Sequence, residues 1–154
     1  LTHPSQPHVV RTKALLALSG LVRHFAPGLQ ALRDAGGLSA IISCLTSPDR
    51  RLARKAMTTL SYILTQRQAD CTTAHQQGAL PPLLAALGLP SAAAEGAAST
   101  SEGDADASGS SSQEDSDFRQ AALGALLQLA GHPDTWAVVR EAPGLRPRLA
   151  ELEA

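Results

Sequence analysis

The side chains that could do chemistry in this chain are few and far apart. Five histidines and two cysteines are spread over 154 residues, and Cys71 and His75 form the one Cys–His pair at helical i, i+4 spacing. Two ligands do not make a zinc site, which takes three or four. The sequence contains no nucleophile-elbow motif, phosphate-binding loop or dinucleotide-binding glycine pattern. We therefore expect no catalytic residue, no metal site and no cofactor, and predict that the chain is not an enzyme.

Charge divides the chain into two unlike parts. Seven of its 14 acidic side chains lie between residues 91 and 117, in a stretch rich in Ser, Ala and Gly that contains neither Lys nor Arg. The rest of the chain holds all 13 Lys and Arg and the other seven acids, a balance of +6. A basic surface attracts an acidic protein or a polyanion. We expect no nucleic acid partner, because the basic residues have no aromatic side chains interleaved with them.

Internal repeats organise the chain. The segments 10–21, 52–63 and 118–129 align with one another, and apolar residues recur in each with spacings of four, four and three. That spacing places them on one stripe of a helix. We therefore expect three long helices, each burying one stripe. The stripe positions are 10, 14, 18 and 21, then 52, 56, 60 and 63, then 118, 122, 126 and 129.

A shorter element follows each long helix. Gly36, Gly78 and Gly144 each precede apolar residues at helical spacing, which suits a chain reversal before a helix. The second long segment follows the first after 42 residues and the third follows the second after 66, an excess of 24. The excess falls in residues 91–116, which have too little apolar surface to offset the entropy of ordering. We expect a disordered acidic loop there.

A period near 42 residues, made of a short, a middle and a long helix, is typical of armadillo and HEAT repeats. The sequence therefore predicts an all-α, right-handed helical solenoid without a sheet. Asp49 is expected to cap the second long helix and Asp117 the third. The predicted units are the last helix of a truncated repeat (1–24), one repeat (25–66), a repeat with the insertion 91–116 (67–132), and a partial or capping repeat (133–154).

The helical phase also predicts a row of outward-facing residues. Positions 9, 13, 16 and 20 lie opposite the first buried stripe, and the long helix of an armadillo repeat lines the concave face of the array. Lys13 and Lys55 fall at one repeat position, although each could also serve only to solvate its helix. Tyr62 falls on the same row, where an aromatic ring could anchor an interface or pack against a neighbouring helix. The expected partner-contact residues are Lys13, Leu16, Gly20, Arg51, Arg54, Lys55, Thr58, Tyr62 and Gln128.

Several runs of residues carry a closer resemblance. They are Val10-Arg-Thr-Lys-Ala-Leu-Leu-Ala-Leu-Ser-Gly-Leu-Val-Arg23, Ala35-Gly-Gly-Leu38, Arg54-Lys-Ala56 and Leu60-Ser-Tyr-Ile-Leu64. These runs resemble the armadillo nucleotide-exchange factors of DnaK-type, 70-kDa heat-shock chaperones. The resemblance covers residues 9–88 well and 117–153 less closely. The acidic loop departs from that family, and the first repeats of the family's core are absent.

The resemblance implies a co-chaperone. Members of the family embrace one lobe of the chaperone's ATPase domain and open its cleft so that ADP leaves, which means that factor and nucleotide weaken each other's binding. The family has a basic residue at the position of Lys55, so the resemblance assigns the partner contact to Lys55 first. We expect a monomer that acts in the cytoplasm, or alternatively in the lumen of the endoplasmic reticulum, where the family also has members.

The sequence also leaves an alternative to the co-chaperone function. A generic armadillo scaffold that binds another protein through its concave face is the alternative. Armadillo proteins of the nuclear-import or catenin type share a ladder of Asn, but this sequence contains no Asn and has Gly20, Tyr62 and Gln128 at the ladder positions.

No apolar run approaches the roughly 18 residues that span a bilayer. The two cysteines fit small buried side chains in a reducing compartment. Because the sequence begins with Leu1, we expect it to be part of a longer protein.

Overall fold

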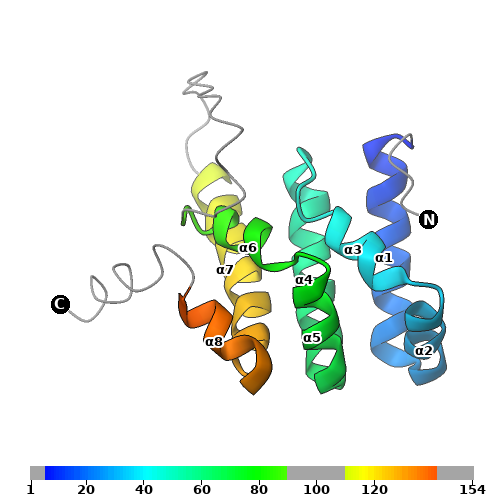
Figure 1. Ribbon diagram of the computed structural model, residues 1–154. Helices are drawn as coiled ribbons and strands as arrows, with labels where there is room; N and C mark the ends of the chain where they lie inside the picture. The colour runs from blue at the N-terminus through cyan, green and yellow to red at the C-terminus, as the bar shows by residue number, and fades with distance from the viewer. Residues whose placement is uncertain (1–5, 90–109, 142–154) are drawn as a thin grey trace.

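The computed structural model of the protein describes residues 6–89 and 110–141. Within these ranges the chain forms eight α-helices and no β-strand (Figure 1). Three helices are long and five are short. Their bounds are α1 (His8–His24), α2 (Ala26–Asp34), α3 (Gly37–Ser43), α4 (Arg50–Gln66), α5 (Gln68–Gln76), α6 (Leu80–Ala86), α7 (Ser110–Ala130) and α8 (Pro133–Glu141).

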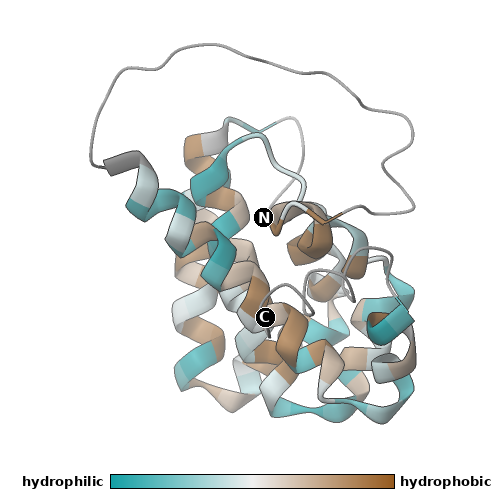
Figure 2. Ribbon diagram, turned by 90° about the vertical axis from the view of Figure 1, so that its left-hand side faces the viewer, coloured by the Kyte–Doolittle hydropathy of each residue, from teal (hydrophilic) through white to brown (hydrophobic). Residues whose placement is uncertain are grey.

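The helices form two layers. The long helices α1, α4 and α7 lie side by side, with α4 packed against both of the others. The short helices lie in front of them in the view of Figure 1, and a turn of 90° separates the long helices on the left from the short ones on the right (Figure 2). This repeating arrangement of short and long helices leaves the outer side of α1, α4 and α7 free to form a continuous surface, called here the long-helix face.

Local residues explain where several helices begin. Asp49 caps α4 as predicted, because its carboxylate accepts from the backbone N–H of Arg51 at 2.9 Å and of Leu52 at 3.3 Å. Gly36 and Gly78 have φ of +66° and +78°, a left-handed conformation that favours glycine. They stand between α2 and α3 and between α5 and α6, where they let the chain reverse direction within a residue or two.

The helix α4 forms the centre of the core. It is buried on two sides because it lies between α1 and α7. The predicted stripe of α4 is confirmed, and in α7 the stripe positions 122, 126 and 129 are also buried while Phe118 is half-buried. The buried residues of α4 are Leu52, Ala53, Ala56, Met57, Thr59, Leu60, Ile63 and Leu64.

The stripe predicted for α1 is wrong. Val10 and Leu21 are 48% and 50% exposed, and the buried side chains of α1 include Leu15 and Val22 instead. The reason is position in the array. The helices α4 and α7 each pack against a preceding long helix, and among the described residues α1 has no such neighbour.

The opposite end of the array shows the complementary pattern. Leu123 of α7 stands at the repeat position of Leu15 and Met57, which are both fully buried, yet it is 46% exposed. The helices α1 and α4 each pack against a long helix that follows them in the chain, and α7 has no following long helix among the described residues. Each long helix therefore carries two apolar sides, and a helix at the end of the array buries only one of them.

The acidic stretch is partly helical, contrary to the prediction of a disordered loop over 91–116. The helix α7 begins at Ser110, so residues 110–116 form its first two turns. Asp117 lies well inside this helix and does not cap it. The physical reason is a set of ion pairs between α7 and α4, described below. The loop residues 91–109, and the helix predicted after Gly144, lie outside the described residues.

Within the described part of the chain, the structure contains no helix with the length and apolar character needed to cross a membrane.

Candidate protein-binding surface

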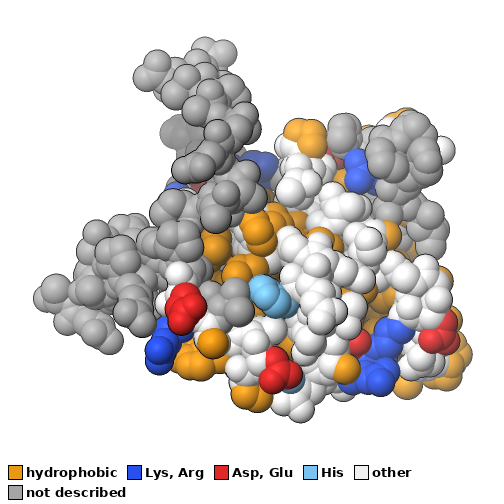
Figure 3. Space-filling model, in the orientation of Figure 1, with side chains coloured by type: hydrophobic (Ala, Val, Ile, Leu, Met, Phe, Trp, Pro, Cys, Tyr) orange, Lys and Arg blue, Asp and Glu red, His pale blue; other side chains and the backbone are white. Residues whose placement is uncertain are grey.

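The residues predicted to contact a partner lie on the three long helices. Lys13, Leu16 and Gly20 of α1 are exposed, as is Arg51 of α4. The other predicted residues are half-buried; they are Arg54, Lys55, Thr58 and Tyr62 of α4 and Gln128 of α7. The opposite face, formed by the short helices, shows charged side chains scattered among apolar and uncharged polar ones (Figure 3).

An open groove of about 570 Å³ runs between α4 and α7. Its lining includes three of the predicted residues: Arg54, Thr58 and Tyr62. Gly124 of α7 also lines the groove, and a Cβ there would lie 3.6 Å from the Ser61 hydroxyl. The predicted partner-contact set omits five charged or polar residues of this lining, which are Arg23, Ser61, Thr65, Asp117 and Gln120. The groove is open to solvent rather than enclosed, which suits contact with a protein surface.

Tyr62 joins α1 to α4 while also lining the groove. Its hydroxyl donates to the backbone carbonyl of Arg23 at 3.0 Å. The guanidinium of Arg23 lies 5.6 Å from the centre of the Tyr62 ring, within the range of a cation–π contact. The ring therefore packs against a neighbouring helix, which was the structural alternative left open by the sequence. It also holds Arg23 at the mouth of the groove.

Lys55, like Arg54 beside it, is a half-buried cation of this face. Its pKa lies below the ordinary value of 10.5, chiefly because burial disfavours the charged amine and further because Arg23 and Arg54 stand near by. No described carboxylate lies within ion-pair distance of Lys55, and the same is true of Lys13 and Arg23. These three cations leave positive charge uncompensated on the α1 side of the long-helix face.

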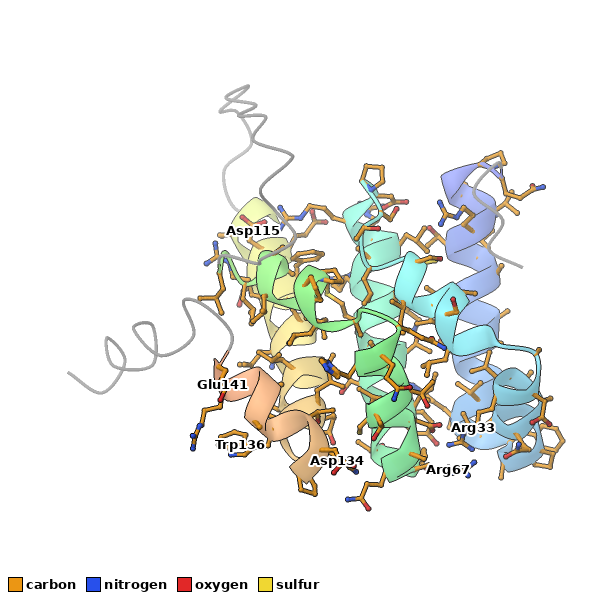
Figure 4. The ribbon with its side chains drawn as sticks, in the orientation of Figure 1. Arg33, Arg67, Asp115, Asp134, Trp136 and Glu141 are labelled. Atoms are coloured by element: carbon orange, nitrogen blue, oxygen red, sulfur yellow. The ribbon has the colours of Figure 1, made fainter. Side chains whose placement is uncertain are left out.

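Three ion pairs compensate the other side of the face. At the start of α4, Arg50 contacts Asp115 at 2.5 Å, Arg51 contacts Glu114 at 3.8 Å, and Arg54 contacts Asp117 at 2.9 Å. The guanidinium of Arg50 also lies 4.7 Å from the centre of the Phe118 ring. Figure 4 shows Asp115 at the beginning of α7. The partners in each pair are separated by more than 60 residues, so no local sequence signal announces them.

One further ion pair lies between the short helices. Arg33 of α2 donates to both carboxylate oxygens of Asp70 in α5, at 3.0 and 3.2 Å from Nε and 2.6 Å from a terminal nitrogen. Both side chains are largely buried, at 18% and 9% exposure. This pair joins consecutive repeats on the side away from the long-helix face.

Cys71, the cysteine of the Cys71–His75 pair, is a buried residue of the helix core. The Cys71 thiol is buried and lies near the backbone carbonyls of Leu64 and Gln128, at 3.7 and 3.8 Å. Burial, and secondarily the charge of Asp70, raises the pKa of this thiol. The described residues contain no group of three His, Cys, Asp or Glu side chains that could hold a metal ion.

Part of the chain matches a known family of repeats. Residues 26–65 match the Armadillo/beta-catenin-like repeat. The match runs from the start of α2 to the last turn of α4, so it contains one short, one middle and one long helix. Among curated protein sequences there is no significant match.

The family match and the helical architecture together confirm the predicted all-α solenoid with armadillo-type repeat structure. A solenoid of this kind exposes an extended surface made of equivalent positions from successive repeats. The repeat therefore indicates a scaffold for protein–protein interaction.

Proposed function

We propose that the chain binds the ATPase domain of a 70-kDa heat-shock chaperone through its long-helix face and promotes the release of ADP. The proposal rests on the resemblance of residues 9–88 to the armadillo nucleotide-exchange factors. The observation that carries it is the setting of Lys55, a half-buried cation between Arg23 and Arg54 that lacks a described carboxylate partner. A carboxylate on the chaperone would relieve that charge imbalance, which supports Lys55 as the principal contact.

Nucleotide exchange by this route needs no catalytic residue. If the long-helix face binds the open form of the ATPase domain better than the closed form, binding shifts the domain towards the open form. ADP then leaves faster, and by linkage ADP weakens the binding of the chain by the same factor. We propose a monomeric protein with this activity, in the cytoplasm or alternatively in the lumen of the endoplasmic reticulum, with no nucleic acid or membrane partner.

The alternative is an armadillo scaffold whose partner is another acidic protein. The groove between α4 and α7 and the cations beside it would serve that function equally well. ADP dependence distinguishes the two possibilities, since only a nucleotide-exchange factor must bind more weakly when ADP is present.

The test follows the release of fluorescent ADP from the isolated ATPase domain, with and without the chain. The proposal predicts that the chain accelerates release, that Lys55→Glu removes the acceleration, and that Arg140→Glu on α8 keeps it. Arg140 is an exposed arginine on a short helix, so it controls for the change in net charge. Release at the same rate with and without the unmodified chain would contradict the proposed exchange activity.

A further inference from the structure

Carboxylates at the start of α7 form ion pairs with arginines of α4 that an acidic partner would otherwise contact. Arg50, Arg51 and Arg54 point from the first turns of α4, and each has one acidic partner on α7. Arg51 and Arg54 belong to the predicted partner-contact set. The arginine end of the long-helix face is therefore already occupied by a negatively charged helix from the same chain.

The three ion pairs are of the kind that an external group can replace. Their side chains are between 39% and 80% exposed, so water reaches both members of every pair. Ion pairs exposed to this degree contribute little to folding stability, because solvent and salt screen them. A carboxylate from a partner could take the place of Glu114, Asp115 or Asp117 at small cost to the fold.

The two ends of the face differ in what they offer an acidic partner. At the α1 end, Lys13, Arg23 and Lys55 have no described carboxylate at ion-pair distance. At the α7 end, three arginines are matched one to one by three acids. Arg54 stands at the boundary, since it lines the groove with Asp117 and also lies close enough to Lys55 to lower the pKa of its amine.

We propose that the first turns of α7 are an internal competitor for the acidic surface of the partner. Glu114, Asp115 and Asp117 hold the arginine end of the face until an external carboxylate displaces them, while the lysine end stays open. This inference rests on the proposed function only in requiring that an acidic partner binds the long-helix face. Its consequence is lower affinity for weakly acidic proteins and selection for partners whose carboxylates reach both ends.

A different role for the same contacts would be to fix α7 against α4. The two roles predict opposite changes when the acids are neutralised. If the acids compete with the partner, affinity rises; if they only position α7, affinity stays the same or falls with the loss of order in α7.

The experiment compares two variants with the same net charge. The first is Glu114→Gln, Asp115→Asn, Asp117→Asn. The second, a matched control, is Asp34→Asn, Asp134→Asn, Glu141→Gln, which neutralises the same types of side chain on the short helices α2 and α8. The probes are a fluorescent oligoglutamate peptide and, separately, the ATPase domain of a 70-kDa chaperone. Far-UV circular dichroism records the helix content of each variant.

We expect the first variant to bind oligoglutamate about tenfold more tightly than the matched control at low salt, where electrostatic differences are largest. Asp117→Asn alone, which leaves the pairs of Arg50 and Arg51 in place, should give a smaller gain. Equal or weaker binding by the first variant would overturn the inference.

The two probes separate this inference from the proposed function. A gain towards oligoglutamate without any binding of the ATPase domain would support the internal competitor and contradict the chaperone as partner. Binding of the ATPase domain with no difference between the two variants towards either probe would contradict the internal competitor and leave the chaperone in place.

Discussion

Two sets of arginine–carboxylate contacts cross from one repeat to the next, and they differ in burial. Arg33 and Asp70 meet between α2 and α5 with both side chains largely buried, through three hydrogen bonds. The pairs between α4 and α7 lie on the long-helix face and are open to solvent.

Burial decides what each set can do. Removing one member of a buried pair leaves the other charge without water or partner, so the pair acts as a permanent link between repeats. An exposed pair loses little when it opens, because water replaces each contact. The same chemistry therefore holds the array together on one side and remains exchangeable on the side proposed to bind a partner.

The largest effect is expected at the buried pair. Asp70→Ala should lower the free energy of unfolding by about 3 kcal/mol, because Arg33 keeps its charge in a largely buried site. Chemical denaturation measures this change. Asp34→Ala is the control on the same short helix as Arg33: it is exposed and its carboxylate accepts from Gln30, so its loss should cost within about 0.5 kcal/mol. Similar losses for the two variants would erase the proposed distinction between buried and exposed contacts.

The next effect concerns partner binding. Lys55→Glu should weaken binding of the chaperone ATPase domain by roughly 2–5 kcal/mol, since it places a like charge opposite a carboxylate of the partner. Titration calorimetry measures the affinity, and circular dichroism should show unchanged helix content. Arg140→Glu should alter the affinity much less. An unchanged affinity for the Lys55 variant would contradict Lys55 as a contact residue, and it would leave the description of the fold unchanged.

Neutralising the acids of α7 should lower the free energy of unfolding by a modest amount that depends on salt. Each exposed pair is worth about 0.2–1 kcal/mol, so the Glu114→Gln, Asp115→Asn, Asp117→Asn variant should lose at most a few kcal/mol in total. The loss should shrink as salt rises towards about 1 M, where the screening length falls to about 3 Å. Urea denaturation at low and high salt checks this. A large loss of unfolding free energy that does not depend on salt would mean that these pairs, like Arg33–Asp70, are permanent links between repeats.

The smallest effect is a gain. Lys55→Gln should stabilise the free chain by up to about 0.5 kcal/mol, because it removes a partly buried cation beside two arginines. The lowered pKa means that folding disfavours the protonated amine. That penalty is present in full below the folded pKa and disappears as the pH rises past the unfolded value of about 10.5. The stability gap between the variant and the unmodified chain should therefore be largest near neutral pH and close in alkaline solution. A gap that widens with pH would contradict this sign.

Local periodicity was sufficient to predict the helices and the core of α4. The four–four–three spacing of Leu52, Ala56, Leu60 and Ile63 lies within one helix, and the cap at Asp49 depends on its nearest neighbours. The outward phase of Lys55 follows from the same helix. Whether α1 buries the matching stripe is different, because that depends on which neighbouring helix is present rather than on the residues of α1.

Contacts between distant residues could not be predicted in the same way. Arg33 and Asp70 are 37 residues apart, and Arg54 and Asp117 are 63 apart. Seven acids in a Ser- and Gly-rich stretch indicate disorder when read alone. Beside three arginines of α4, the last of them form helical turns instead. Composition predicts the tendency of a segment, and the neighbours supplied by the fold decide the outcome.

Lys55 is proposed as the principal contact with the partner, and this can be measured directly because Lys13 and Lys55 are the only two lysines of the sequence. Amine acylation followed by mass spectrometry reports the reaction rate of each lysine in the free chain and in the presence of saturating chaperone ATPase domain. Buried interface contacts exclude the reagent, so Lys55 should lose most of its reactivity in the complex, while Lys13, which is exposed on the neighbouring helix, should lose less. Acylation of Lys55 at the same rate with and without a bound ATPase domain would contradict the account.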